Sequence, residues 1–242
     1  GLGDVYKRQP VYYTAVYDYK GNLLLDNSSS ETHTVLKEQT AWLLTSALES
    51  VITQGTGTSA ALSNQPVAGK TGTTNNETDK WFCGFTPYYT ASIWLGYDDN
   101  SKVLSKSISH TKIWQKIMSQ IHEGLSTGEF TQPSGIVTAQ VCSQSGKLAV
   151  AGLCDEDPRG SQVITEYFSA DNVPTEECDT HVKVTICNDS GDIASAGCTN
   201  TSTRVYIKKS SSGTASDEES SYSAYDSYYA ITDEKISRLC SL

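Results

Sequence analysis

The stretch 67-VAGKTGTTNNETDKWFCGFTPYYTASIWLGYDDN-100 decides the fold of the first half of the chain. Residues 81–85 and 90–96 are rich in aromatic and β-branched side chains and flank a turn at residues 86–88, which predicts a hairpin. The run 67–73 precedes this hairpin and consists of small side chains around one lysine. We expect the run to form the edge strand of the same antiparallel sheet.

The run contains both Gly-Lys-Thr and Lys-Thr-Gly, which occur in two different kinds of site. Gly69, Lys70 and Thr71 match the end of a phosphate-binding loop, whose full pattern is Gly-x-x-x-x-Gly-Lys-Ser/Thr. Here the first position of that pattern is Asn64, and Pro66 removes a backbone N–H from the loop that would hold the phosphate. The remaining interpretation is a Lys-Thr-Gly strand that lines an acyl-transfer site.

Alternation along a strand distributes the motif over two faces. Lys70 and Gly72 would share one face, and Thr71 and Thr73 the other. Gly69 and Gly72 carry no side chain, so we expect the backbone of a ligand to approach the strand closely at these positions.

Two amphipathic helices flank the predicted sheet in the sequence. Residues 40–58 show helical spacing that ends at two glycines, with apolar positions at Trp42, Leu43, Ala47, Leu48, Val51 and Ile52. Residues 111–125 show one helical stripe made of Ile113, Trp114, Ile117, Met118 and Ile121. Residues 11–27 have the pattern of a further hairpin. The predicted fold class is therefore α+β, an antiparallel sheet with flanking helices.

Composition argues against nucleic-acid binding and against a membrane-spanning segment in this sequence. The 242 residues carry a formal net charge of −10, whereas a nucleic-acid-binding surface is basic. No apolar run approaches the ~20 residues that span a bilayer. The sequence begins without Met and residues 1–9 show no periodicity, so we expect a non-native or truncated start there.

From residue 131 to residue 208 the sequence changes to cysteines, short β-like runs and turns. The segments 141–154 and 186–198 both follow the pattern apolar-Cys-x-x-Ser-Gly-x-apolar-Ala and close on a second cysteine. This internal match indicates a duplicated small unit with a β-rich character.

The cysteines of the two units are expected to form disulfides. A link across a loop of this length stabilises a protein by roughly 3 kcal/mol in the chain-entropy model. The predicted pairs are Cys142 with Cys154 and Cys187 with Cys198. A zinc site that joins Cys178 and His181 to two thiols is the alternative, but no Cys-x-x-Cys pair supports it. We therefore expect no metal and no cofactor.

Residues 209–242 are dominated by serine, tyrosine and acidic side chains. We expect this tail to be disordered, apart from a short helix in its last residues. Cys240 in the tail has no evident partner, and Cys83, inside a predicted strand, is expected to be a buried free thiol.

The run from residue 65 to residue 100 resembles the third motif region of the penicillin-binding proteins, in particular their bifunctional high-molecular-weight class. The Gly-Thr-Gly-Thr turn at residues 55–58 and the segment 113-IWQKIMSQIHEGL-125 are similar to elements on either side of that motif in the family. The resemblance covers residues 10–130, as the C-terminal part of a transpeptidase domain. Residues 131–208 resemble C-terminal extensions of such enzymes. A partial penicillin-binding transpeptidase or serine beta-lactamase-like fold is implied.

The resemblance implies a peptidoglycan D,D-transpeptidase that acts through a serine acyl-enzyme on D-Ala-D-Ala stem peptides and binds beta-lactams. By position, Lys70, Thr71, Gly72 and Thr73 would form one wall of the site. Lys70 would bring positive charge to the substrate, and the hydroxyls of Thr71 and Thr73 would bind its carboxylate. The N–H of Thr73 would be an oxyanion-hole donor, and Thr74 would also contact substrate.

The other two motifs of the family are missing. The one Ser-x-x-Lys runs from Ser109 to Lys112, after Lys70, where family order makes it a coincidence, and no Ser-x-Asn occurs. We therefore expect a fragment that is inactive alone. A missing N-terminal portion would carry the nucleophile, the membrane anchor and, in the bifunctional class, a glycosyltransferase domain. The expected location is the extracytoplasmic face of the membrane, with other cell-wall synthesis proteins as partners.

Two alternatives stay open at this point. A serine beta-lactamase-like hydrolase shares the Lys-Thr-Gly strand and the acyl-enzyme. A non-catalytic wall-binding module on a degenerate transpeptidase scaffold is permitted by the missing motifs.

Overall fold

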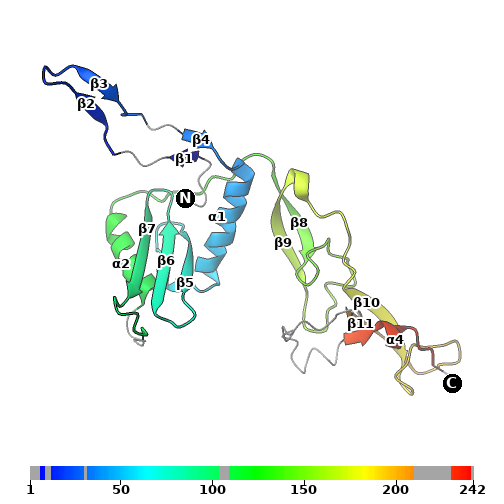
Figure 1. Ribbon diagram of the computed structural model, residues 1–242. Coiled ribbons are helices and arrows are strands. Elements are labelled where there is room, and N and C mark those ends of the chain that lie inside the picture. The colour runs from blue at the N-terminus through cyan, green and yellow to red at the C-terminus, as the bar shows by residue number, and fades with distance from the viewer. Residues whose placement is uncertain (1–5, 9–11, 30–31, 104–108, 210–229, 241–242) are drawn as a thin grey trace. The chain divides into compact units, whose positions relative to one another are not determined.

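The computed structural model describes residues 6–8, 12–29, 32–103, 109–209 and 230–240 (Figure 1). The chain divides into two compact units, Gly1–Ile136 and Val137–Leu242. Among the described residues no helix has the length and apolar character that a membrane crossing requires.

The first unit is built around the predicted sheet. Strands β5 (Ala68–Thr73), β6 (Asp79–Phe85) and β7 (Thr90–Gly96) lie side by side in this order, and both pairs are antiparallel. The hairpin of β6 and β7 turns at residues 86–89, where the N–H of Thr86 donates to the carbonyl of Tyr89 at 2.9 Å. The three predicted strands are thus confirmed, and β5 is an edge strand of the described sheet.

Helices α1 (Glu38–Thr53) and α2 (His110–Ile121) pack on this sheet, and a 3-10 turn η1 (Thr58–Ala60) lies between α1 and β5 in the sequence. One core joins all these elements, made of Ile52, Ala60, Val67, Phe82, Trp114 and Met118. The rings of Phe82 and Trp114 meet edge to face at 5.1 Å, and the indole of Trp114 donates to the carbonyl of Ala91 at 3.0 Å. The α+β class is confirmed.

The buried stripes of the helices are narrower than their sequences predicted. In α1 the buried positions are Ala41, Thr45, Leu48 and Ile52, whereas Ala47 is exposed. In α2, Trp114 and Met118 are buried, but Ile117 and Ile121 are 45% and 47% exposed. Trp114 and Met118 thus form the packed face of α2, and Ile117 and Ile121 lie at its solvent-exposed margin.

The N-terminal region forms two small sheets. Strands β2 (Ala15–Tyr17) and β3 (Leu23–Asp26) make the predicted hairpin, whose turn is held by Asp18, since its carboxylate accepts from the N–H groups of Lys20 and Asn22. Strand β1 (Tyr6–Arg8) pairs with β4 (Thr32–Thr34). β1 falls inside residues 1–9, for which a non-native start was expected, and residues 1–5 and 9 lie outside the described residues.

The second unit consists of two further sheets. Strand β8 (Ile136–Cys142) pairs with β9 (Val163–Ser169), which is followed by the 3-10 turn η2 (Ala170–Asn172). The other sheet has the order β10 (His181–Cys187), β11 (Thr201–Lys209) and β12 (Ala230–Thr232), with β11 antiparallel to β10 and parallel to β12.

Part of the expected disordered tail belongs to this second unit. Residues 210–229 and 241–242 lie outside the described residues, but β12 and helix α4 (Asp233–Ile236) are formed. Ile231 is 1% exposed and Cys240 5% exposed. These two buried residues anchor the end of the chain, which was expected to be disordered apart from a short helix.

Candidate functional site at the free edge of the sheet

The backbone of β5 presents hydrogen-bonding groups to its open side. The N–H of Thr74 donates to the carbonyl of Asp79 at 3.2 Å, so these opposite residues form a hydrogen-bonded pair. In an antiparallel ladder such pairs alternate with pairs that do not bond each other. Two pairs of opposite residues therefore share no backbone hydrogen bond with each other, namely Thr71 with Phe82 and Thr73 with Lys80. The N–H and C=O groups of Thr71 and Thr73 point away from β6, to the free edge.

Lys70 brings positive charge to this edge. Its side chain is exposed, and its ammonium donates to the carbonyl of Thr71 at 3.0 Å. Because that carbonyl faces the free edge, the ammonium lies along the edge as well. An acceptor group of a ligand could replace the carbonyl without any change in the strand.

The hydroxyls of Thr71 and Thr73 have different surroundings. Thr71 is half-buried, and its Oγ1 lies 2.7 Å from Oγ1 of Thr56 in the glycine-rich turn. Thr73 is exposed at the end of the strand. Thr71 therefore ties the turn to the strand, and Thr73 offers its hydroxyl to solvent.

Thr74 belongs to the turn that follows β5. Its Oγ1 accepts from the N–H of Asp79 at 3.0 Å and lies 3.0 Å from Oγ1 of Thr78. Hydrogen bonds from the Trp94 indole and from Thr78 lower the pKa of the Asp79 carboxyl. Thr74 thus orders a charged turn, whereas its position in the motif predicts a substrate contact.

The two glycines of the motif serve different purposes. A Cβ on Gly69 would lie 2.7 Å from the Phe82 ring and 2.8 Å from the carbonyl oxygen of Cys83. On Gly72 the nearest atom is the Cβ of Trp81, at an ordinary 3.5 Å. Gly69 is thus required by packing inside the sheet, and its expected role in the approach of a ligand is not what fixes it. Only Gly72 leaves open space.

The face that carries Lys70 is open in the described residues. Lys70 pairs with Cys83 and Gly72 with Trp81, so these side chains project to the same side. Cys83 is a free thiol as predicted, but it is exposed rather than buried. Trp81 and the neighbouring Trp94 are 44% and 43% exposed. The core lies on the opposite face, with Phe82.

Ser109 has a structural role. It is the N-cap of α2, where its hydroxyl accepts from the N–H of Lys112 and lies 2.7 Å from Oγ1 of Thr111. The Ser-x-x-Lys match at residues 109–112 is therefore a helix cap. That the match is a coincidence stays a prediction, which rests on the order of the motifs.

The cysteines of the second unit converge in two groups. All seven cysteines of the chain are free thiols in the structure, so neither predicted disulfide is formed. One group consists of Cys142, Cys154, Cys178 and His181, and the other of Cys187, Cys198 and Cys240. The first group contains Cys178, His181 and two thiols, which is the set expected for the zinc alternative. Cys240, for which no partner was expected, joins the second group.

A buried carboxylate accompanies the first group. Burial acts to raise the pKa of Asp157, but hydrogen bonds from Arg159 and His181 lower it to about 2. The guanidinium of Arg159 contacts both carboxylate oxygens, at 3.0 Å and 2.8 Å. Asp157 is therefore an anion held inside the protein beside His181.

Two family models match the chain. Residues 4–119 match the family described as "Penicillin binding protein transpeptidase domain", and residues 132–183 match "Penicillin-binding protein 1A, C-terminal domain". The chain is 40% identical over 173 residues to penicillin-binding protein 1A of Clostridium perfringens, which covers 71% of this chain and 21% of that protein. It is 31% identical over 170 residues to penicillin-binding protein 1A/1B of Bacillus subtilis, with 63% and 18% covered.

A solved structure shares the fold. Penicillin-binding protein 1A from Haemophilus influenzae superposes with a TM-score of 0.53 at 20% identity, over 73% of this chain and 31% of that chain. The fold and the Lys-Thr-Gly edge strand define a transpeptidase domain of the penicillin-binding type. The chain belongs to the penicillin-binding protein family, as a C-terminal part of the 1A kind. It spans about a fifth of the length of the curated relatives that it matches.

Proposed function

We propose that this chain is the C-terminal part of a peptidoglycan D,D-transpeptidase and supplies one wall of its active site. The observation that carries the proposal is the open edge of β5, where a lysine ammonium and outward backbone groups lie together. An extended peptide that adds to such an edge is recognised through its backbone. A stem peptide that ends in D-Ala-D-Ala has that form, with a carboxylate at its end.

The proposed reaction is acyl transfer in two steps. A serine hydroxyl attacks the carbonyl between the two D-alanines, an ester forms, the peptide bond breaks, and D-alanine leaves as the amine. The amine of a second stem peptide then attacks the ester, forms a new peptide bond and releases the serine. No Ser-x-x-Lys precedes Lys70 in residues 1–242, so the serine would come from a part of the enzyme outside these residues.

Each residue of the Lys-Thr-Gly strand has its own proposed role in binding the substrate. The Lys70 ammonium attracts the carboxylate, and the exposed Thr73 hydroxyl donates to it. The outward N–H of Thr73 would stabilise the oxyanion of the tetrahedral intermediate, which the strand register supports. Thr71 and Thr74 act by positioning, because their hydroxyls are already engaged by Thr56 and Asp79. Gly72 leaves the space that the substrate occupies.

The proposed setting follows from the substrate. Peptidoglycan stem peptides and beta-lactams, which imitate their D-Ala-D-Ala end, would be the ligands, and other cell-wall synthesis proteins the partners. The site would then work on the extracytoplasmic side of the bacterial membrane. An anchor and a glycosyltransferase domain would belong to the portion outside residues 1–242.

The test is acylation of the longer enzyme that contains this chain by a fluorescent penicillin. A charge-assisted hydrogen bond contributes about 1.5–3 kcal/mol, so we expect Lys70→Ala to slow acylation by about 10- to 150-fold. Lys112→Ala is the matched control, because it removes an exposed lysine from α2, and it should acylate at the parent rate. Equal rates for the Lys70→Ala variant and the parent would refute the proposal.

The chain of residues 1–242 gives a second test. Without a serine nucleophile it should not be labelled covalently by the same penicillin, even at long incubation. Stable labelling of any residue in it, mapped by mass spectrometry, would show that the chain carries its own nucleophile and that the division of roles proposed here is wrong.

A further inference from the structure

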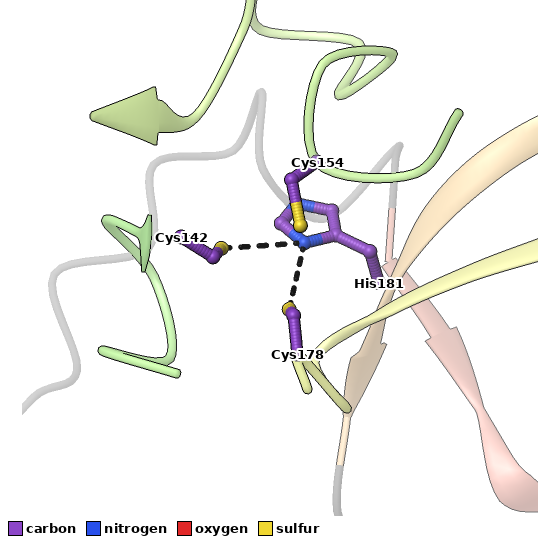
Figure 2. A group of neighbouring side chains, drawn as sticks. All are labelled: Cys142, Cys154, Cys178 and His181. Carbon is purple, nitrogen blue, oxygen red and sulfur yellow. Dashed lines mark hydrogen bonds between the residues drawn. The ribbon is translucent and has the colours of Figure 1, made fainter. Parts of the chain in front are cut away.

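Three thiols and one imidazole meet inside the second unit. Cys142 ends β8, Cys154 lies in the segment between β8 and β9, and Cys178 lies just before His181, the first residue of β10. Their ligand atoms all lie within 4.8 Å of one another, and all four residues are buried. Figure 2 shows the three sulfurs around one nitrogen of the His181 ring.

The distances fit a tetrahedral zinc ion. With Zn–S near 2.3 Å and Zn–N near 2.0–2.1 Å, a tetrahedron has S···N edges of about 3.5 Å and S···S edges of about 3.8 Å. Nδ1 of His181 lies 3.6 Å from the Cys142 sulfur and 3.4 Å from the Cys178 sulfur. These two sulfur–nitrogen separations match the edges of such a tetrahedron, and all four donor atoms lie within 4.8 Å of one another.

The imidazole is oriented for metal binding. Its other nitrogen, Nε2, lies 2.7 Å from Oδ2 of Asp157, which Arg159 holds in turn. In a neutral ring, Nε2 then carries the proton and donates to the carboxylate, while the lone pair of Nδ1 faces the sulfurs. A carboxylate behind the histidine is the usual outer partner in zinc sites, where it fixes the tautomer and makes the ring a better ligand.

The internal repeat supplies independent support, because its second copy builds the same arrangement from different residues. Both copies contain the same hydrogen bonds from backbone N–H groups. Cys142 donates to the carbonyl of Lys147 as Cys187 does to that of Asp192, and Val150 donates to the Cys154 sulfur as Ser195 does to the Cys198 sulfur. Cys178 donates to the carbonyl of Leu148 as Cys240 does to that of Ile193. Cys178 therefore corresponds to Cys240. The conserved product of the two copies is a trio of converging thiols.

We propose that Cys142, Cys154, Cys178 and His181 bind one Zn²⁺ ion as a structural site. Thiolates with imidazole in a tetrahedral set favour zinc among the common divalent ions. Binding would convert three thiols to thiolates, release three protons and leave a complex with a charge of −1. Four protein ligands leave no open position, so the ion holds the fold and performs no chemistry.

A disulfide explains this arrangement less well. It would join two of the three sulfurs at about 2.05 Å and leave the third thiol and the Nδ1 lone pair of His181 without a function. It would also leave unexplained why the Asp157 carboxylate, paired with Arg159, is buried behind the imidazole. A zinc ion uses all of these groups.

The experiment is residue-resolved alkylation of the 242-residue chain, purified in a phosphine reductant without chelator. Metal content is measured by mass spectrometry, and alkylated cysteines are mapped before and after addition of a strong zinc chelator. We expect retained zinc, with Cys142, Cys154 and Cys178 protected until the chelator is added. Cys83 is exposed and lies outside both groups, so it should react at once in both conditions and serves as the internal control.

Two variants sharpen the result. Cys178→Ser should lose one equivalent of zinc relative to the parent, whereas Cys83→Ser should lose none. If Cys178→Ser does not fold, binding of Co²⁺ to the parent replaces it, with an intense thiolate-to-cobalt absorption expected in the near ultraviolet. The proposal is overturned if the parent retains no zinc and shows no such absorption. A disulfide among the three cysteines in peptides mapped without reductant would overturn it as well.

Discussion

Gly69 leaves no room for a side chain, because its missing Cβ lets β5 lie against Phe82. Gly69→Ala should destabilise the chain by about 1–3 kcal/mol, the usual cost of extra volume in a packed site. Gly72→Ala is the matched variant on the same strand and should cost less, since its nearest neighbour is at 3.5 Å. Urea unfolding measures both. Equal losses would contradict the packing role of Gly69.

Asp157 acts on zinc through His181, so its variant tests positioning rather than ligation. Asp157→Asn keeps the size of the side chain but removes the charge that polarises the imidazole. Loss of such a partner typically weakens metal binding 10- to 100-fold, and we expect a loss of roughly that size in competition with a chromophoric chelator. Asp171→Asn, an exposed carboxylate in η2, is the control and should bind as the parent does.

Ser109 and Lys70 show how far single residues can be interpreted from sequence. The order of motifs predicts that Ser109 is not the nucleophile that accompanies Lys70, and the structure shows Ser109 as a helix cap. The engagement of the Thr71 and Thr74 hydroxyls could not be foreseen, because Thr56 and Asp79 reach them only after the turns have formed.

At the scale of elements, α2 depends on one face of its apolar stripe. Trp114→Ala should cost about 3–5 kcal/mol, since it empties a fully buried site beside Phe82 and removes the hydrogen bond to Ala91. Ile117→Ala, on the same helix but 45% exposed, should change stability by about 0.5 kcal/mol or less. Chemical denaturation of the two variants compares them. A large loss for Ile117→Ala would mean that the exposed stripe is covered.

In the chain of residues 1–242, the second copy of the repeat should bind zinc more weakly than the first. Residues 1–242 give it three thiols, Cys187, Cys198 and Cys240, and the position that corresponds to His181 falls three residues after Cys240, outside this range. Within this range solvent would supply the fourth ligand. A zinc titration against a chelator should show two classes of site, and Cys240→Ser should remove only the weaker one. Loss of the tighter class in that variant would contradict the assignment.

At the scale of the whole molecule, two units with separate cores should unfold separately. An ion that binds only the folded state stabilises the unit that holds it and leaves the other unit alone. Calorimetry should therefore show two transitions, of which a zinc chelator lowers one. Trp114→Ala should lower the other transition. A single transition that responds to both changes would show that the units are one cooperative body.

The sequence by itself determined the three strands 67–96, the two helices, the duplicated cysteine unit and the family. Short-range patterns predict these features: side-chain alternation in the strands, helical spacing in the helices, and the Lys-Thr-Gly motif followed directly by the aromatic hairpin. They need no knowledge of the rest of the chain.

Only the tertiary structure decided which cysteines meet and which groups face the free edge. Cys142 and Cys178 come together because β8 and β10 bring distant segments to one place, with Leu148 bonded to residues 176 and 178. The choice between disulfide and metal depends on a third sulfur and an imidazole that no local spacing reveals. Contacts between residues far apart in sequence are fixed by how the elements pack, and packing energy belongs to the whole unit rather than to any one segment.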